Sequence, residues 1–389
     1  MAQGRLATLG FGRDVFAPEH EAFRATLRRF FQKEVEPNVR QWEKDGFFPA
    51  ELFRKAGQAG VLCAGIPEEY GGMGGDLLHH MILHEEHAYT PACVALEGGL
   101  STDFTAYALL NAGTEAQKHE WLPRFASGES IAEIGLSEPG AGSDANAITT
   151  HARPDGIGGY IITGQKAWIT NAPIMTVILA VCRTRPPGER DGLSIFIVPM
   201  DAEGVSRRST ELMAKGAGGV GEIFFDEVRV PAEALLGGVE GGGLKAALSL
   251  ITIGRVATAV RAIAACEVAL ELTVDYAKTR RAFGRTIFEF QNTQHKLASV
   301  ATETRAGRYF VDAAIAKMVA GNLDVAEASM LRVFCTEVEG RVMDECLQLF
   351  GGNGYSNENI ISKMYALARV HRIYGGTSEI MRNIIARSL

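Results

Sequence analysis

Apolar residues repeat with helical spacing through the first third of the chain. In the stretch EAFRATLRRFFQKEV, the apolar residues that fall on one helical face are Phe23, Leu27, Phe30 and Phe31. The charged residues fall on the opposite side, which is typical of an amphipathic helix. Breakers such as GIPEEYGGMGG at 65–75 separate such stretches. We therefore predict a helical N-terminal domain over residues 15–130.

The pattern of apolar positions changes at about residue 131. The stretches YIITGQKAWIT, TVILAVCR, LSIFIVPM and EIFFDEVRV are short, rich in β-branched and aromatic residues, and bounded by Gly, Pro or Asp. These features are typical of strands. They predict a sheet or barrel over residues 131–238.

A glycine-dense segment, GGVEGGG at 237–243, marks the next boundary. The residues after it, 244–345, contain almost no proline and carry long helical patterns rich in Ala, Leu and Glu, as in a helical bundle. We predict a C-terminal helical domain over residues 239–389. The expected fold class is therefore mainly α with a central β domain.

Composition and charge narrow the class of protein. With 389 residues, 47% of them hydrophobic and 22% charged, the chain has the composition of a globular protein of two or three domains. A formal charge of −7 argues against a nucleic-acid binder. The N-terminus has no apolar core of signal-peptide length, and the longest apolar run, IMTVILAVC at 174–182, is too short to span a membrane. We therefore expect a cytoplasmic protein without a membrane partner.

The cysteines and histidines give no metal-binding pattern. None of the six cysteines lies in CxxC spacing, which indicates neither a zinc knuckle nor a dithiol redox motif. His80, His84 and His87 share one face of a predicted helix, but they form no HExxH motif. No metal is predicted, and a reducing compartment is the simplest interpretation.

Two stretches of the β domain carry candidate chemistry. GLSEPGAGSDANA at 135–147 combines hydroxyl groups, acids and small residues that let backbone N–H groups approach a ligand. In GQKAWITNA, Trp168 offers a flat apolar face, and Thr170 follows two positions later on the same side of a strand. Trp168 by itself is equally consistent with a buried core residue.

Together with three C-terminal stretches, these motifs resemble the acyl-CoA dehydrogenase family of flavoproteins. The stretches are KTRRAFGRTIFEFQ (278–291), QLFGGNGY (348–355) and IYGGTSEI (373–380). EIFFDEVRVPAEALLG (222–237) adds a further motif, and the family's order of motifs is kept. The resemblance extends from about residue 15 to the C-terminus. It implies an N-terminal helical domain, a middle β-barrel and a C-terminal four-helix bundle, usually in a homotetramer. It also implies FAD as cofactor, an acyl-CoA thioester as substrate and an electron acceptor such as an electron-transfer flavoprotein.

The resemblance assigns cofactor contacts to particular residues. The positions that match contacts to the flavin and its pyrophosphate are Leu136, Ser137, Gly142 and Ser143, with Trp168 and Thr170 bordering the isoalloxazine ring. The positions that match contacts to the adenine half, held partly by a neighbouring subunit, are Arg280, Phe283, Gln291, Gln348 and Gly352, with Thr377 and Glu379 as further contacts. An arginine can neutralise a phosphate, and an apolar ring face suits a flat cofactor.

Two further positions concern the substrate and the pocket around it, and two others a structural ion pair. Ser143 suits a CoA-thioester site, and Arg255 matches an arginine that is common near the active site and that orders the pocket. The family's usual Arg-Asp pair in the closing stretch is replaced by Ala366 and Leu367, which puts one of its structural ion pairs in doubt.

The catalytic base departs from the family's pattern. Oxidation of a thioester to its enoyl form needs a base for the α-proton, hydrogen bonds to the carbonyl oxygen and flavin N5 as hydride acceptor. Most members place a glutamate base at one of two positions, which correspond here to Gly254 and Gly375. Gly375 still offers its backbone N–H to the carbonyl oxygen. The carboxylate must come from elsewhere, because a positioned base contributes about 10²–10⁴ in rate.

The best replacement base is Asp103, in EGGLSTDFTAYALLNAG. By resemblance this stretch lies on helices that line the acyl pocket. Asp103 also suits a helix N-cap, because it follows Ser-Thr and precedes a helical pattern. Glu97 and Tyr374 are weaker candidates.

Three functions remain open at this stage. The first is an FAD-dependent acyl-CoA dehydrogenase with a displaced base. The second is a base-less structural partner in a mixed oligomer whose other subunit is active. The third is an oxidase or monooxygenase that uses the flavin to activate oxygen.

Overall fold

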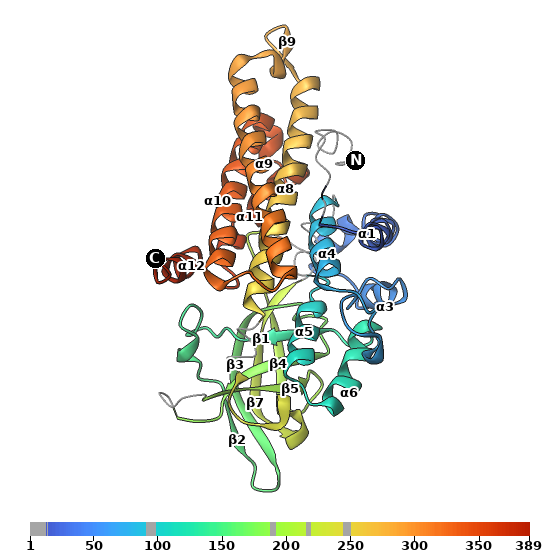
Figure 1. Ribbon diagram of the computed structural model, residues 1–389, viewed down its shortest axis with the longest axis vertical. Helices are drawn as coiled ribbons and strands as arrows, with labels where there is room; N and C mark the ends of the chain where they lie inside the picture. The colour runs from blue at the N-terminus through green and yellow to red at the C-terminus, as the bar shows by residue number, and fades with distance from the viewer. Residues whose placement is uncertain (1–12, 14, 91–98, 187–191, 215–218, 244–249) are drawn as a thin grey trace. The chain divides into compact units, whose positions relative to one another are not determined.

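The computed structural model describes residue 13 and residues 15–90, 99–186, 192–214, 219–243 and 250–389. The chain forms two compact units (Figure 1). We name them the helical unit and the sheet unit. The helical unit comprises Met1–Phe31, Met81–Val94 and Thr252–Leu389, and the sheet unit comprises Gln32–His80 and Ala95–Ile251.

The helical unit contains three long helices and several short elements. Its elements are α1 (Pro18–Phe30), the part of α4 (Leu77–Tyr89) from Met81 onward, α8 (Ile251–Thr279), α9 (Gln291–Val319), α10 (Val325–Phe350), α11 (Ile360–Ala368), α12 (Ser378–Ala386), and the hairpin β8 (Arg281–Ala282) and β9 (Arg285–Thr286). Short helical turns occupy Ile287–Glu289, Gly351–Tyr355 and Val370–Arg372. Figure 1 shows the hairpin at the tip that joins α8 to α9.

Close contacts hold the long helices together. The ring of Tyr276 on α8 stacks on that of Phe350 on α10 with centroids 4.3 Å apart. A Cβ atom added at Gly307 of α9 would lie 2.3 Å from the side chain of Ile263 on α8, so the absence of a side chain there permits close packing. Helix α10 begins at a cap, because Asp324 accepts a hydrogen bond of 2.8 Å from the N–H of Glu327.

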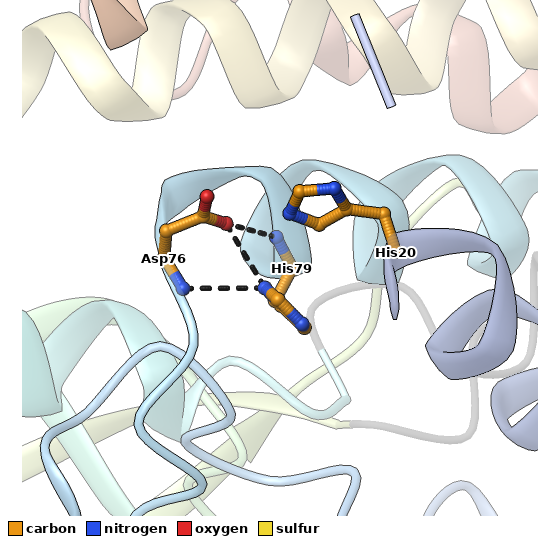
Figure 2. A group of neighbouring side chains, drawn as sticks. All are labelled: His20, Asp76 and His79. Atoms are coloured by element: carbon orange, nitrogen blue, oxygen red, sulfur yellow. Dashed lines mark hydrogen bonds and ion pairs between the residues drawn. The ribbon is translucent and has the colours of Figure 1, made fainter. Parts of the chain in front are cut away.

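The helices of the sheet unit are shorter. They are the π-helical turn Phe31–Val35, which crosses the boundary between the units, then α2 (Val39–Asp45), α3 (Glu51–Gln58), the turn Glu68–Tyr70, the first residues of α4, α5 (Thr102–Ala112) and α6 (Glu115–Ala126). Asp76 caps α4: its Oδ1 accepts the N–H of Leu78 at 2.9 Å, and the Asp76 N–H donates to Nδ1 of His79 (Figure 2). Thr114 and Gln117 form a reciprocal capping box at α6.

Seven strands form the sheet of this unit. They are β1 (Ala132–Gly135), β2 (His151–Pro154), β3 (Gly159–Thr170), β4 (Val177–Arg183), β5 (Leu193–Pro199), β6 (Val205–Thr210) and β7 (Val220–Pro231). Their order is β1-β4-β2-β3-β7-β6, with β5 on β4. Strands β1 and β4 are parallel, whereas β4 and β5 are antiparallel, as are β3 and β7. The residues of β4 and β5 are buried except at their ends, as expected of a core strand pair.

The predicted order of helices, sheet and helices is confirmed. The predicted middle β domain is also confirmed, and it is a seven-stranded sheet. Among the described strands, β6 and β1 at the two ends of the strand order do not pair with each other. Further short turns lie at Ala145–Ala147, Ala232–Ala234 and Leu236–Gly238.

No helix within the described ranges is long and apolar enough to cross a membrane.

Candidate active site

The SEPGAG loop is docked onto strand β3. The carbonyl of Ser137 accepts the N–H of Ala167 at 2.9 Å, and the carbonyl of Leu136 accepts from Nζ of Lys166 at 3.3 Å. Strand β1 leads directly into this loop. The loop motif and the Trp168 motif therefore meet, with Ser137 beside Ala167, the residue that precedes Trp168.

Glu138 anchors the same loop through a buried ion pair. Its carboxylate accepts hydrogen bonds from Nζ of Lys166 at 2.8 Å, from the N–H and hydroxyl of Thr149 and from the N–H of Thr150. Burial alone would raise the pKa of Glu138, but these donors outweigh it and lower the pKa to about 2. Glu138 is therefore a permanently charged anchor and not an acid that exchanges protons near neutral pH.

Trp168 is not a core residue, and the interpretation as core filler is wrong. Its side chain is 61% exposed, whereas the adjacent Ala167 and Ile169 are buried. The pairing with β7 shifts by one residue between Lys166 and Ile169, which is a β-bulge, and Trp168 has a φ of 62°. Bulges of this kind redirect side chains and occur often beside active sites. Thr170 is half-buried, whereas Ile169 between Trp168 and Thr170 is buried. This alternation is expected if Thr170 lies on the same side of the strand as Trp168.

The loop around Gly142 leaves room for a flat or phosphate-bearing ligand. Gly142 and Ser143 are exposed. A Cβ atom at either Gly140 or Gly142 would have no atom within 4 Å. FAD needs hydrogen-bond donors for its phosphates and an apolar face for its ring. The Ser143 hydroxyl and the backbone around Gly142 can supply the donors, and the exposed ring of Trp168 can supply the face. These residues of the sheet unit therefore fit the flavin half of the cofactor.

The residues predicted to contact the adenine half gather at one end of the helical unit. Tyr276 near the end of α8 accepts a hydrogen bond of 3.0 Å from Asn353, just after α10, so the two helix ends are adjacent. The predicted residues at or beside these ends, all exposed, are Arg280, Phe283, Gln291, Gln348 and Gly352. Phe283 is 94% exposed with a φ of 50°. An aromatic ring presented on a hairpin tip suits contact with another molecule.

A buried arginine holds the YGGT turn. The guanidinium of Arg332 donates to the carbonyls of Gly375 at 2.6 Å, His371 at 3.2 Å and Tyr374. Gly375 is exposed with a φ of 60°, a conformation that favours glycine. Within the described part of the chain, no acceptor binds the Gly375 N–H. The predicted contact of this amide with a substrate carbonyl stays a prediction.

Thr377 and Glu379 lie immediately beyond this turn. Thr377 caps α12, because its hydroxyl accepts the N–H of Ile380 at 3.4 Å. The Glu379 side chain is 77% exposed and lies 3.9 Å from Arg382. Both residues have local structural roles, and their predicted cofactor contacts stay predictions.

A second buried arginine, Arg255, lies close enough to Arg332 for their charges to interact. Arg255 is 4% exposed and donates to the Val325 carbonyl and the Ser329 hydroxyl. Burial, and secondarily the charge of Arg332, lowers the pKa of Arg255 to about 10. The partners of the two arginines among the described residues are backbone carbonyls and the Ser329 hydroxyl, with no carboxylate. Leu367, where the family usually has an acid, is itself buried. The loss of that structural ion pair stays a prediction.

Asp103 is a buried carboxylate but not a helix cap. Its Oδ1 accepts the N–H of Cys63 at 2.7 Å, and its Oδ2 lies 3.9 Å from Nδ1 of His80. Only 3% of the residue is exposed. The N-cap of α5 is Ser101, without a side-chain capping bond, so the cap interpretation of Asp103 is wrong. Of the weaker candidates, Glu97 lies outside the described residues and Tyr374 is half-buried.

Family models match the chain in three consecutive parts. Residues 17–129 match the acyl-CoA dehydrogenase N-terminal domain, residues 133–228 the middle domain and residues 241–389 the C-terminal domain. The chain belongs to the acyl-CoA dehydrogenase family. Members are FAD-dependent oxidoreductases that act on acyl-CoA, so the predicted enzyme class and cofactor are confirmed.

Individual relatives agree with this assignment. The chain is 38% identical to the long-chain specific acyl-CoA dehydrogenase of Mus musculus mitochondria, covering 99% of this chain and 89% of the relative. It matches the crystal structure of an acyl-CoA dehydrogenase from Geobacillus kaustophilus with a TM-score of 0.91 at 38% identity, over 96% and 98% of the two chains. A glutaryl-CoA dehydrogenase from Mycobacterium smegmatis, solved in complex with FADH2, gives 0.88 at 28% identity, over 96% and 95%.

The structure adds one residue that sequence reasoning missed. Glu133 lies on β1, only 7% exposed, and accepts hydrogen bonds from Ser101 and Asn171. The sequence did contain a signal, because an acid interrupts the apolar stretch IAEIGL immediately before the acyl-CoA dehydrogenase motif SEPGAGSD. A lone acid in a buried strand requires a specific partner or a proton.

Proposed function

We propose that this chain oxidises an acyl-CoA thioester to its enoyl-CoA, and that an acid other than the family's usual glutamates accepts the α-proton. One observation carries the proposal. Both usual base positions, 254 and 375, are glycine, while the exposed Trp168 and the docked loop at Ser137 retain what a flavin site needs.

The chain supplies two groups to this reaction. The Gly375 N–H binds the thioester carbonyl oxygen and stabilises the charge that develops there. Asp103 takes the proton from the α-carbon as the double bond forms between the α- and β-carbons. Bound FAD supplies the acceptor for the hydride that leaves the β-carbon. Asp103 suits this task because Cys63 fixes one oxygen and the first turn of α5 places the carboxylate at a favourable helix end.

Anaerobic bleaching of the flavin tests the proposal. Oxygen-free, FAD-loaded protein is mixed with a panel of acyl-CoA thioesters, and the visible flavin absorbance is followed. We expect one thioester to bleach the wild type rapidly and Asp103→Asn to slow bleaching by about 10²–10⁴. Asp201→Asn, an exposed site in the turn after β5, is the control for a lost carboxylate. Bleaching of Asp103→Asn at the wild-type rate would exclude Asp103 as the base.

The absence of glutamate at both positions also favours a second function, that of a base-less partner subunit. Gly254→Glu separates the two, because position 254 lies in α8 and can present a carboxylate. A chain without a base should bleach slowly and gain rate from Gly254→Glu, whereas a chain that uses Asp103 should not. Copurification of a glutamate-bearing paralogue would support the partner function. Fast reoxidation of the reduced protein by air would instead favour oxygen activation.

The partners follow from the same proposal. We propose a homotetramer, in which the exposed hairpin at Phe283 contacts a neighbouring subunit's cofactor, and an electron-transfer flavoprotein as electron acceptor. The cytoplasmic location also stays a prediction.

A further inference from the structure

Glu133 joins three segments of the sheet unit. Its Oε1 accepts hydrogen bonds from the hydroxyl of Ser101 at 2.5 Å and from Nδ2 of Asn171 at 2.8 Å. Nδ2 of Asn171 also donates to the carbonyl of Gly99 at 3.0 Å. The carboxyl group therefore connects strand β1, the start of α5 and the turn after β3.

Each of these segments carries a residue of the proposed site. Strand β1 continues into Ser137, the start of α5 precedes Asp103, and the turn after β3 follows Trp168 and Thr170. Asn171 is fully buried with a φ of 55°, and its carbonyl accepts the N–H groups of Ile174 and Met175. A strained, buried residue keeps its conformation only where its surroundings hold it. The contact with Glu133 is one of those that hold Asn171.

Among the residues that the structure describes, no cation pairs with Glu133. The buried titratable residues on the elements that contact β1 are Asp103 and Tyr107 on α5, Lys166 on β3 and Cys182 on β4. Lys166 is bonded to Glu138, and Asp103 to the Cys63 amide. Burial raises the pKas of the Tyr107 phenol and the Cys182 thiol, which leaves both neutral. The donors to Glu133 within the described ranges are thus two neutral groups, and both bond to the same oxygen.

This arrangement suits an uncharged carboxyl group. A protonated acid has one carbonyl oxygen that accepts hydrogen bonds and one hydroxyl oxygen that carries the proton. Here Oε1 takes the acceptor position for both donors. Burial raises the pKa of Glu133 to about 8, although the bonds from Ser101 and Asn171 act in the opposite direction.

We propose that Glu133 is a positioning residue whose uncharged carboxyl group ties β1, the start of α5 and the Trp168–Asn171 turn together, so that loss of its proton perturbs the predicted flavin site. The inference rests on the proposed function, because it gives a role to the site that this function uses. Glu133 acts through Ser101 and Asn171 and is not assigned a contact with substrate.

A pH titration of the flavin spectrum tests this role. The visible absorption of the FAD-loaded wild type should show a one-proton transition centred near pH 8. Glu133→Gln keeps an acceptor oxygen and a neutral group of the same shape, so it should retain the neutral-pH spectrum and lose the transition. Glu129→Gln, an exposed acid nearby in the sequence, changes the net charge equally and should keep the transition. Glu133→Ala should alter the spectrum even at neutral pH.

Several results would overturn the proposal. One is a wild-type spectrum that does not change between about pH 6 and pH 9.5, and another is a transition that persists in Glu133→Gln. A third is a slowing of substrate bleaching by about 10²–10⁴ in Glu133→Gln at pH 7, because it would make Glu133 the proton acceptor itself. The spectral titration needs no acyl-CoA. Failure of the wild type to bleach with any thioester would therefore count against the proposed function and leave the positioning role to be decided by the spectrum.

Discussion

Two buried carboxyl groups, one in each unit, have pKa values shifted in opposite directions. Glu85 in the helical unit is 1% exposed, and Glu133 in the sheet unit is 7% exposed. Burial alone would raise both pKas. Around Glu85, the charges of Arg13, Arg308 and Arg24 outweigh burial and hold its pKa well below the usual range. Around Glu133 no cation of the described part of the chain does so, and burial raises the pKa to about 8.

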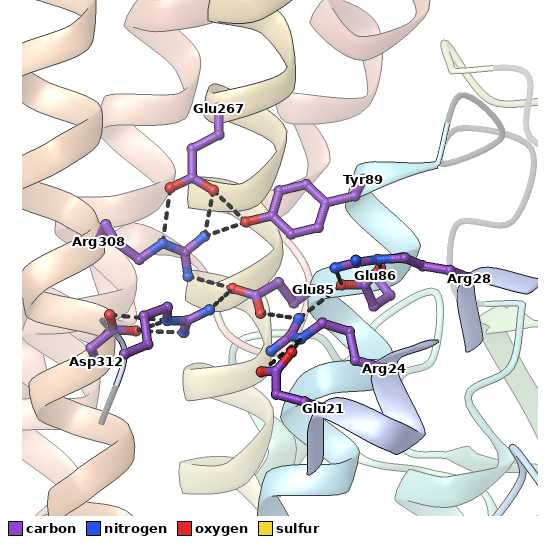
Figure 3. A network of polar contacts seen from close by, with 10 residues as sticks. Glu21, Arg24, Arg28, Glu85, Glu86, Tyr89, Glu267, Arg308 and Asp312 are labelled. Carbon is purple, nitrogen blue, oxygen red and sulfur yellow. Dashed lines mark hydrogen bonds and ion pairs between the residues drawn. The ribbon is translucent and has the colours of Figure 1, made fainter. Parts of the chain in front are cut away.

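The site around Glu85 is a network of charges from four helices and the N-terminal segment. Figure 3 shows the side chains of α1, α4, α8 and α9 that converge on it. Glu85 accepts hydrogen bonds from Arg13 at 2.5 Å, Arg24 at 2.6 Å and Arg308 at 2.6 Å. Arg308 also binds Glu267 at 2.7 Å. Positively charged partners thus keep a buried carboxyl group ionised in a structural ion network, whereas neutral donors leave it able to exchange a proton.

Removal of one arginine from the network should have the largest effect. Arg308→Ala leaves Glu85 and Glu267 with too little positive charge, so we expect a loss of about 3–5 kcal/mol in the free energy of unfolding. Urea unfolding measures it. The matched control is Arg341→Ala, which removes an exposed pair with Glu303 on the same set of helices and should cost far less. Equal losses of unfolding free energy in the two variants would show that the buried network does not stabilise the charged form of Glu85.

The next effect concerns the pH dependence of stability. The folded pKa of Glu133, about 8, lies above the ordinary value of 4.5, so the folded protein binds the extra proton between these values. The contribution of Glu133 to the free energy of unfolding is complete below about pH 4.5 and is lost as pH rises towards 8. Between pH 6 and pH 8 this loss amounts to about 2 kcal/mol.

Glu133→Gln should remove this part of the pH slope, and Glu129→Gln should not. Thermal or urea unfolding at several pH values measures the slope. Glu85 should act in the opposite direction, because a lowered folded pKa gives stability that disappears only as pH falls below about 4.5. An identical slope for the wild type and Glu133→Gln between pH 6 and pH 8 would contradict the difference between the two acids.

The smallest effect tests how a neutral donor tunes Glu133. The hydrogen bond from Ser101 lowers the pKa of Glu133, so Ser101→Ala should move its titration to higher pH. The lost bond should cost about 1 kcal/mol of stability. The midpoint of the flavin spectral transition measures the shift, with the exposed Ser206→Ala as control. A midpoint that stays in place or moves to lower pH would show that Ser101 does not stabilise the ionised form.

The open loop of the candidate site could be expected from the sequence, because local motifs carry it. Ser137, Gly142 and Ser143 lie in a loop whose small and hydroxyl residues are visible in the chain, and the structure leaves that loop open. The exposure of Trp168 could not be predicted, because it depends on a bulge opposite β7, a segment distant in sequence. The partner of Asp103 is the amide of Cys63, so a residue that resembles a cap locally is bonded elsewhere.

Glu85 and Glu133 were missed as functional or structural residues for a related reason. In LLHHMILHEEHAY the visible pattern is that of the histidines, which share one helical face. The arginines that bind Glu85 come from the N-terminal segment, α1 and α9. No periodicity relates such positions. Their charge states follow from which side chains the fold brings within hydrogen-bond distance.

The sequence by itself determined the order of helices and strands, the family and the absence of glutamate at positions 254 and 375, because periodicity, turn residues and motifs are local properties of the chain. Only the tertiary structure decided which acids carry charge. A carboxyl group responds to the burial and the partners it meets in three dimensions, and those partners lie far along the chain.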